Sequence, residues 1–305
     1  MTSIPVASAA GSSTDAVWLQ RRNVALPRPA AVAACLLATV SGLALWGFAY
    51  GRLLGRIQEG RSQHELHSTL REQLARQTSP IGGHIRVGAP VAFLRVPSIG
   101  IGDEVVVEGT SSGVLTAGPG HRRDTALPGQ PGVSVLMGRS VAFGAPFASV
   151  AHLHRGAIID AVTGQGTFRY RVERVRRDGD DLPTPLPVGG ARLTLVTSEG
   201  SDNLTGGWER HTVFVDALLA GPAQPRTGAA PVRRLPSVEA AMRGDPRAAV
   251  PLALWLAALV VTLAAAAWAY GRWGSRPTLL ASVPVVVACL WGATEVAARL
   301  VPNLV

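Results

Sequence analysis

Apolar and polar positions alternate along the middle of the chain with the two-residue period of β-strands. From Ala89 onward, short alternating segments are separated by clusters of Gly, Pro and Asp. Side chains in a strand point alternately to its two faces, so this pattern marks strands with a buried face. The expected strands are VAFLRVPSI, DEVVVEG, GVSVLMG, GAIIDAVT, GTFRYRVERVRR, ARLTLVTS and HTVFVDALL, with a helical turn at 145–153. Short strands separated by turn signals predict a mainly β protein, a compact barrel or sandwich.

Long uncharged runs lie on both sides of this β region. Residues 30–50 contain no charged side chain, and a run of about 20 such residues crosses a hydrocarbon core of about 30 Å. Two further apolar runs, 250–270 and 277–297, are joined by the short loop GRWGSR. We therefore expect a transmembrane helix at each of these runs, the last two forming a helical hairpin. Glu295 lies near the end of the last run, where its carboxylate can reach interfacial water.

Arginines next to the apolar runs predict the orientation of the chain. Arg21, Arg22 and Arg28 precede the first run, and Arg272 and Arg276 lie in the loop of the hairpin. Positively charged flanks favour the cytoplasmic side of a membrane, and both sets give the same orientation. The sequence therefore predicts a multi-pass protein of the cell membrane whose main domain is extracytoplasmic.

The remaining segments complete the expected domain organisation. Residues 1–29 are expected to form a cytoplasmic tail. Residues 51–80 are expected to form a helical stalk, because Leu66, Leu70 and Leu74 recur at helical spacing. The β domain then covers 81–220, and a linker rich in Pro, Ala and Gly covers 221–249, with a brief helix after Ser237.

Composition excludes several classes of function. The net charge of +9 comes from 29 basic residues, all of them Arg, scattered along a chain with only 5% aromatic residues. A nucleic-acid-binding protein needs a basic stripe or a recognisable module, so we expect no nucleic-acid partner. Both cysteines, Cys35 and Cys289, lie in the apolar runs. Neither a disulfide framework nor a cysteine metal site is available, and we expect neither a metal nor a cofactor.

Several stretches of the β region resemble the sortase family of cell-surface transpeptidases of Gram-positive bacteria. They are FLRVPSIGI, VVVEGTSSGVL, GPGHRRDTALPGQPGVSVLMG, FGAPFASVAHLHRG, FRYRV and RLTLVTS, in the family's order over 91 to about 219. The run from GPGH to FGAPF is similar to the actinobacterial, class E-like branch. The resemblance implies a closed β-barrel of about eight strands with a groove. It also implies a reaction in which an LPxTG-type sorting signal of a cell-wall protein is cleaved after Thr, held on a cysteine and transferred to an amine.

The resemblance also assigns the catalytic positions, and this chain departs from the family there. Ser198 stands at the position of the nucleophilic cysteine, in the stretch LTLVTSEG. Arg139 stands at the position of the histidine, in VLMGRS. The family arginine at the start of the last strand matches either His211 or Arg210. The chain thus looks like a sortase that is degenerate at its catalytic positions.

These replacements change the chemistry that the groove can perform. A serine hydroxyl needs an adjacent base to become a useful nucleophile, whereas a cysteine supplies thiolate near neutral pH. Arg139 cannot act as that base, because a guanidinium keeps its proton, with a pKa of about 12.5 or more in water. The cysteine reaction of the family is therefore expected to fail here.

Two main hypotheses follow, one for a binding protein and one for an enzyme. The first is a pseudoenzyme whose barrel binds a sorting-signal peptide, an active sortase or another cell-envelope protein. The alternative is an unconventional transpeptidase or hydrolase that uses Ser198 on LPxTG-type signals. It would need His211 or His121 as base, oriented by Asp124 or Glu199. His121 and Glu199 are also candidates for lining the groove. A third option makes the membrane hairpin the functional part and the barrel a sensor or spacer.

Overall fold

The computed structural model describes residues 55–200, 210–227 and 234–305, together with residues 42, 45, 46, 50 and 232. The chain divides into two units, Met1–Leu45 and Trp46–Val305, and all contacts described below lie within the second. The expected cytoplasmic tail and nearly all of the first expected span lie outside the described residues, so neither is tested.

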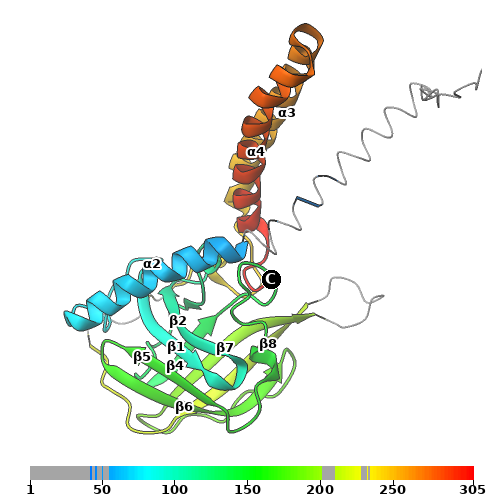
Figure 1. The fold of residues 1–305 in the computed structure, drawn as a ribbon. Coiled ribbons are helices and arrows are strands. Elements are labelled where there is room, and N and C mark those ends of the chain that lie inside the picture. Colours follow the sequence, from blue (N-terminus) through cyan, green and yellow to red (C-terminus); the bar gives the residue numbers. More distant parts are fainter. Residues whose placement is uncertain are drawn as a thin grey trace, which may run out of the picture. The chain divides into compact units, whose positions relative to one another are not determined.

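Eight strands form a closed barrel in the order β1-β2-β3-β4-β7-β8-β6-β5, with β5 paired to β1 (Figure 1). The pairs β2–β3 and β4–β7 are parallel, and the other pairs are antiparallel. This is the closed barrel that the sequence predicts. The strands are β1 (Pro90–Val96), β2 (Ile101–Glu108), β3 (Gly120–His121), β4 (Gly132–Met137), β5 (Ile158–Thr163), β6 (Gly166–Arg177), β7 (Ala191–Gly200) and β8 (Arg210–Leu219).

Alternation explains how the strands fill the barrel. In β6, the side chains of Phe168, Tyr170 and Val172 are buried, whereas those of Arg169 and Arg171 between them are exposed. The inward side chains join those of the other strands in one core cluster. Strand β7 differs, because its first eight residues are buried on both faces. Something other than the barrel interior therefore covers the outer face of β7.

Helix α2 (Gly55–Ala75) packs on the barrel, although the sequence predicts a stalk in this region. Leu70 is fully buried and packs with Phe93 of β1 and Val105 of β2. Leu66 and Leu74 flank it on the same face, as their helical spacing predicts. The side-chain amide of Gln63 also bonds both backbone groups of Val105. The helix is thus an integral part of the barrel domain.

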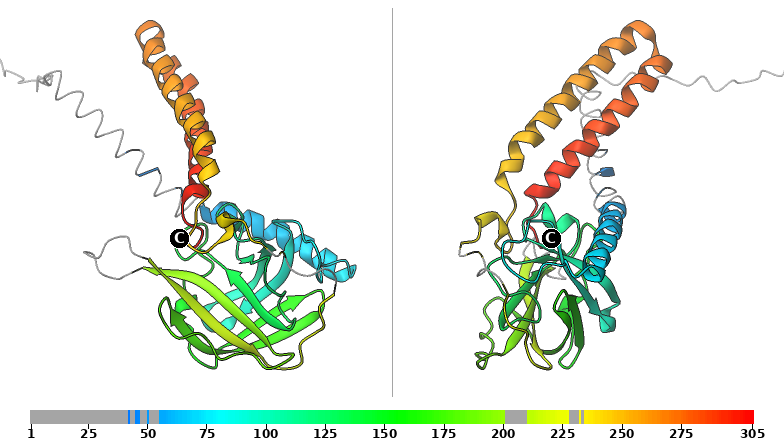
Figure 2. Two further views of the ribbon diagram at one scale, coloured as in Figure 1. Left: turned by 180° about the vertical axis from the view of Figure 1, so that it is seen from behind. Right: turned by 90° about the vertical axis from the view of Figure 1, so that its left-hand side faces the viewer.

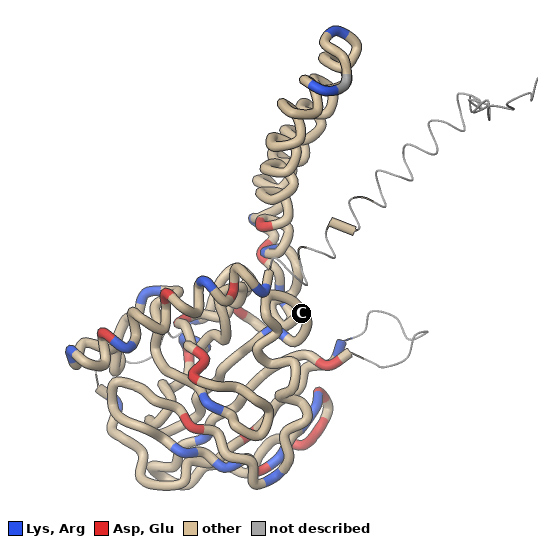
Figure 3. Tube along the Cα trace, viewed as in Figure 1, with Lys and Arg blue, Asp and Glu red and all other residues tan. Residues whose placement is uncertain are grey.

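Helices α3 (Ala249–Trp273) and α4 (Ser275–Leu300) form a hairpin and lie side by side in both views of Figure 2. Only Gly274 separates them, with a positive φ of 81° that favours glycine. By length and composition alone, the segments Pro246–Trp273 and Arg276–Leu300 are able to cross a membrane, with mean hydropathies of 2.3 and 1.8. Figure 3 shows that charged residues occur only at the two ends of the hairpin.

Short 3-10 helices lie in the connections. They are η2 (Pro97–Ile99), η3 (Val114–Thr116), η4 (Val150–His152), η5 (Ser237–Glu239) and η6 (Pro246–Ala248). Helix η4 falls in the expected helical turn at 145–153, and η5 begins at Ser237, where the sequence indicates a brief helix. Glu239 of η5 is buried and forms an ion pair with Arg123. The described part of the expected linker therefore packs against the barrel domain.

Candidate functional site

Ser198 lies on the outer face of β7, next to the end of β4. Arg192, Thr194, Val196 and Ser198 share this face because side chains alternate along the strand. Strand β4 pairs with β7 in parallel, which places Met137 beside Val196. Strand β8 pairs on the other side, and Thr212 is opposite Ser198. Three strands thus form the floor of a cleft that contains Ser198, which is only 3% exposed.

The segment that follows α4 fills this cleft. Residues 301–305 pass from the end of α4 into a turn, in which the Val305 amide donates to the Pro302 carbonyl. The side chain of Leu304 is fully buried and packs with Leu115, Met137 and Val196. In Figure 1 the chain end labelled C lies at the barrel, at the base of the hairpin. This segment, which we call the C-terminal plug, is the cover on the outer face of β7.

Two serines hold the carbonyl oxygen of Leu304. The Ser198 hydroxyl donates to it at 2.8 Å, and the Ser140 backbone amide donates at 3.1 Å. The Ser140 hydroxyl oxygen lies 3.1 Å from the same oxygen and 2.7 Å from the Ser198 hydroxyl oxygen. The proton of Ser198 therefore faces a carbonyl, which accepts a hydrogen bond but does not remove the proton.

Arg139 lies under the plug rather than in solvent. Its side chain is fully buried and donates to the main-chain oxygens of Val305 at 2.6 Å, Ser112 at 2.9 Å and Ala298 at 3.3 Å. Burial lowers the pKa of the Arg139 guanidinium to about 10, so it remains a cation at neutral pH. Arg139 therefore binds main-chain oxygens from α4, the plug and the barrel, and it offers no base.

Gly138 is required for this position of Arg139. A Cβ atom at Gly138 would lie 2.5 Å from the ring of Phe147, far inside contact distance. The Gly138 amide donates to the Val196 carbonyl, which extends the pairing of β4 with β7 by one residue. The Gly-Arg pair thus fixes where the chain leaves β4 and where the guanidinium points.

Of the two candidates for the family arginine, the structure places Arg210 at the cleft. Its Nη1 donates to the hydroxyl oxygens of Ser140 at 3.1 Å and Ser198 at 3.4 Å. His211 is exposed and opposite Glu199, on the other face of the β7–β8 pair. The difference follows from alternation, since neighbouring residues of a strand face opposite sides. His211 is therefore not placed to take a proton from Ser198.

The other candidates for a serine constellation have their own partners. The two ring nitrogens of buried His121 lie 2.8 Å from the Glu108 carboxylate and 2.9 Å from the Ala126 carbonyl. Asp124 pairs with Arg122, and Glu199 pairs with Arg177. The structure brings Ser198, Arg139 and Arg210 together, but it places His121, Asp124 and Glu199 in separate interactions. Within the described part of the chain, no histidine or carboxylate hydrogen-bonds Ser198.

Sequence reasoning missed the plug and two serines that anchor it. Ser112 donates to the carbonyls of Ala298 and Val301, and Ser140 binds Leu304 as described. Ser140 directly follows Gly138 and Arg139 in the stretch VLMGRS. This position could have marked Ser140 as a candidate site residue. No pattern in residues 301–305 marks them as a segment that packs into the barrel.

An open groove continues from the plug along the same face. It has a volume of about 300 Å³ and is lined by Val133, Val135, Thr194 and Leu182, beyond Met137 and Val196. Asp216 in the groove accepts from Arg176 and from Thr194. The groove therefore begins beside the plug, at two residues that also pack against Leu304.

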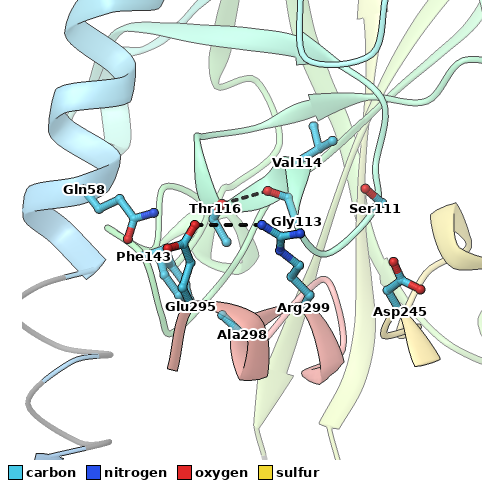
Figure 4. A pocket seen from close by; sticks show the side chains of 10 residues that line it. All are labelled: Gln58, Ser111, Gly113, Val114, Thr116, Phe143, Asp245, Glu295, Ala298 and Arg299. Carbon is cyan, nitrogen blue, oxygen red and sulfur yellow. Dashed lines mark hydrogen bonds and ion pairs between the residues drawn. The ribbon is translucent and has the colours of Figure 1, made fainter. Parts of the chain in front are cut away.

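A second hollow lies where α4 meets the barrel loops. It measures about 250 Å³, and Figure 4 shows Gln58, Glu295, Arg299 and Asp245 around it. Glu295 and Arg299 form an ion pair of 3.8 Å, and both side chains are about half exposed. This polar hollow does not include Ser198, and its charged groups neutralise one another in part.

Comparisons with known proteins identify the class of the barrel domain. Residues 94–217 match the family model described as the sortase domain. The stretch 94–217, which contains most of the barrel, is therefore identified as a sortase domain. No curated protein matches the chain.

Several solved structures that match the chain are sortases. A sortase E variant from Streptomyces avermitilis is 27% identical, with a TM-score of 0.37 over 51% of this chain and 100% of that one. The SrtA sortase from Actinomyces oris is 24% identical, with a TM-score of 0.38 over 46% and 85%. Sortase C from Clostridium perfringens, described "with the C-terminal cell wall sorting motif", is 18% identical, with a TM-score of 0.39 over 53% and 89%.

Proposed function

We propose that this protein is a membrane-anchored sortase-family module of the bacterial cell envelope that lacks cysteine transpeptidase activity and acts by binding a peptide or partner protein. The membrane hairpin would hold the barrel at the envelope. The barrel would offer the cleft between β4, β7 and β8 to its ligand.

The hydrogen bonding of Ser198 carries the proposal that the cysteine chemistry is lost. Within the part of the chain that the structure describes, its partners are a carbonyl oxygen, the hydroxyl of Ser140 and the guanidinium of Arg210. None of these groups takes a proton at neutral pH, and a serine without a base is a weak nucleophile. The nearby Arg139 also stays charged at neutral pH. The site therefore favours binding of main-chain carbonyls over attack on them.

A peptide ligand is supported by what the cleft already binds. The main-chain oxygens of Leu304 and Val305 accept from Ser140, Ser198 and Arg139. A site that satisfies backbone groups and buries an aliphatic side chain has the parts needed to recognise a peptide. A sorting-signal peptide of a cell-wall protein is the ligand class that the family suggests.

Trapping of an acyl intermediate tests the loss of activity. The full chain in detergent is incubated with an LPxTG-type peptide, and intact-protein mass spectrometry is used to look for an adduct. We expect no adduct on wild type and none on a Ser198→Ala control. An ester on Ser198 that is absent from Ser198→Ala would contradict the proposal and establish the serine-enzyme alternative.

A further inference from the structure

The C-terminal plug makes specific polar contacts as well as apolar ones. Asn303 is fully buried, and its Nδ2 donates to the carbonyls of Thr110 at 2.7 Å and Ala240 at 3.0 Å. Its Oδ1 accepts from the Arg243 amide at 3.3 Å. Both donors and the acceptor of the carboxamide are therefore used. A carboxylate in this place would face two carbonyl oxygens without a proton to donate, so the site discriminates Asn from Asp.

The next residue is recognised by shape. Leu304 fills a space between Leu115, Met137 and Val196, all at most 2% exposed. A charged side chain here would be buried among apolar groups without a partner, at high cost. The cleft thus recognises a residue with a side-chain carboxamide followed by a branched aliphatic residue, within the turn from Pro302 to Val305.

The plug is tied to α4 without a linker, because the helix ends at Leu300 and the turn begins two residues later. A ligand attached to its own site experiences an effective concentration on the order of millimolar or higher. A peptide from another molecule must therefore displace the plug before it occupies the same contacts. The open groove beside Val133, Val135 and Thr194 gives such a peptide a place to bind first.

We propose that residues 301–305 are a tethered ligand of the cleft, and that they compete there with a turn-forming peptide that carries Asn followed by an aliphatic residue. The inference rests on the proposed function, in which the cleft is a binding site. It adds the chemical class of the ligand and the element that blocks access. The blocking contact is the pair Asn303 and Leu304.

The test measures peptide binding to an opened cleft. The full chain in lipid nanodiscs carries the double substitution Asn303→Asp and Leu304→Asp, and a labelled peptide LVPNLV is titrated by fluorescence anisotropy. We expect it to bind the double variant at least tenfold more tightly than wild type. The peptide LVPDLV, with one carboxamide changed to a carboxylate, is expected to lose that binding. A chain with Val188→Asp, at a fully exposed residue outside the plug and the groove, serves as control and should behave as wild type.

Hydrogen exchange shows whether the plug has dissociated from the cleft in the double variant. The Ser140 amide donates to the Leu304 carbonyl, so it should exchange slowly in wild type and at least tenfold faster in the double variant. Amides of the barrel core, such as that of Leu195, should keep their protection. If the core is intact and LVPNLV still binds no better, or binds as LVPDLV does, the inference is overturned. An ester on Ser198 would contradict only the proposed loss of activity. The proposed competition between the plug and a peptide would still stand.

Discussion

The hydroxyl of Ser198 donates a hydrogen bond of 2.8 Å to the carbonyl oxygen of Leu304, a residue 106 positions later in the chain. This contact joins Ser198, which the sequence resemblance matches to the family nucleophile, to the segment after the second helix of the hairpin. It explains why Ser198 is buried although its side chain points away from the barrel interior. It also means that access to Ser198 depends on the plug.

Chemical labelling tests this cover. In a background with Cys35→Ser and Cys289→Ser, the substitution Ser198→Cys places a thiol under Leu304. We expect slow alkylation by iodoacetamide, because the thiol is shielded. Adding Leu304→Asp should raise the rate at least about tenfold, since opening would be easier by about 1.4 kcal/mol or more. Equal rates in the two proteins would show that Leu304 does not restrict access.

Arg139 should be more important for stability than an exposed arginine. Arg139→Lys keeps the charge but loses the planar fork that reaches several backbone oxygens. We expect a loss of roughly 2 kcal/mol or more, because each buried acceptor left without a donor costs about 1–3 kcal/mol. Thermal unfolding gives the value, with Arg171→Lys on the exposed face of β6 as control. A loss no larger than that of the control would contradict the role given to Arg139.

The pair Glu104 and Glu59 predicts a pH dependence of stability. Burial, together with the neighbouring Glu59, raises the pKa of Glu104 from 4.5 to about 8. Between these values the folded protein holds a proton that the unfolded chain has released, so stability falls as the pH rises through this window. Glu104→Gln should remove much of that slope and stabilise the protein at pH 8 more than at pH 5. Thermal unfolding at both pH values checks this, and an unchanged slope would exclude Glu104 as its source.

Asp216 provides a comparison between buried and exposed ion pairs. Its side chain is fully buried and accepts from Arg176 at 2.6 Å and from Thr194 at 2.7 Å. Asp216→Ala should cost roughly 3–5 kcal/mol, because Arg176 would be left largely buried without its partner. Asp103→Ala removes the exposed pair with Arg95, whose side chains are 43% and 51% exposed, and should cost about 0–1 kcal/mol. Chemical denaturation measures both, and similar losses would refute the distinction.

The barrel could be predicted because alternation survives in nearly every strand. The sequence does not predict strand β3, because a strand of only two residues, Gly120 and His121, is too short to show alternation. The choice between Arg210 and His211 also needed the structure. Only the register of β8 against β7, with Thr212 opposite Ser198, decides which of two neighbouring side chains faces the cleft.

The plug could not be predicted, for a different physical reason. Its anchors come from positions far away in sequence, such as the Thr110 carbonyl, 193 residues before Asn303. Backbone groups carry no signature in the sequence, and three of the partners of Asn303 are backbone groups. A five-residue segment with one proline and one asparagine reads as an ordinary end to a helix.

Helix α4 leads directly into the turn at Pro302, so a movement of the hairpin is passed on to the contacts in the cleft. A helix rises about 1.5 Å per residue, so sliding α4 by a single residue would already stretch the bonds that Asn303 and Leu304 make. With the hairpin in a bilayer, as proposed, a change in membrane thickness would act along the same axis and would alter how firmly the plug covers Ser198.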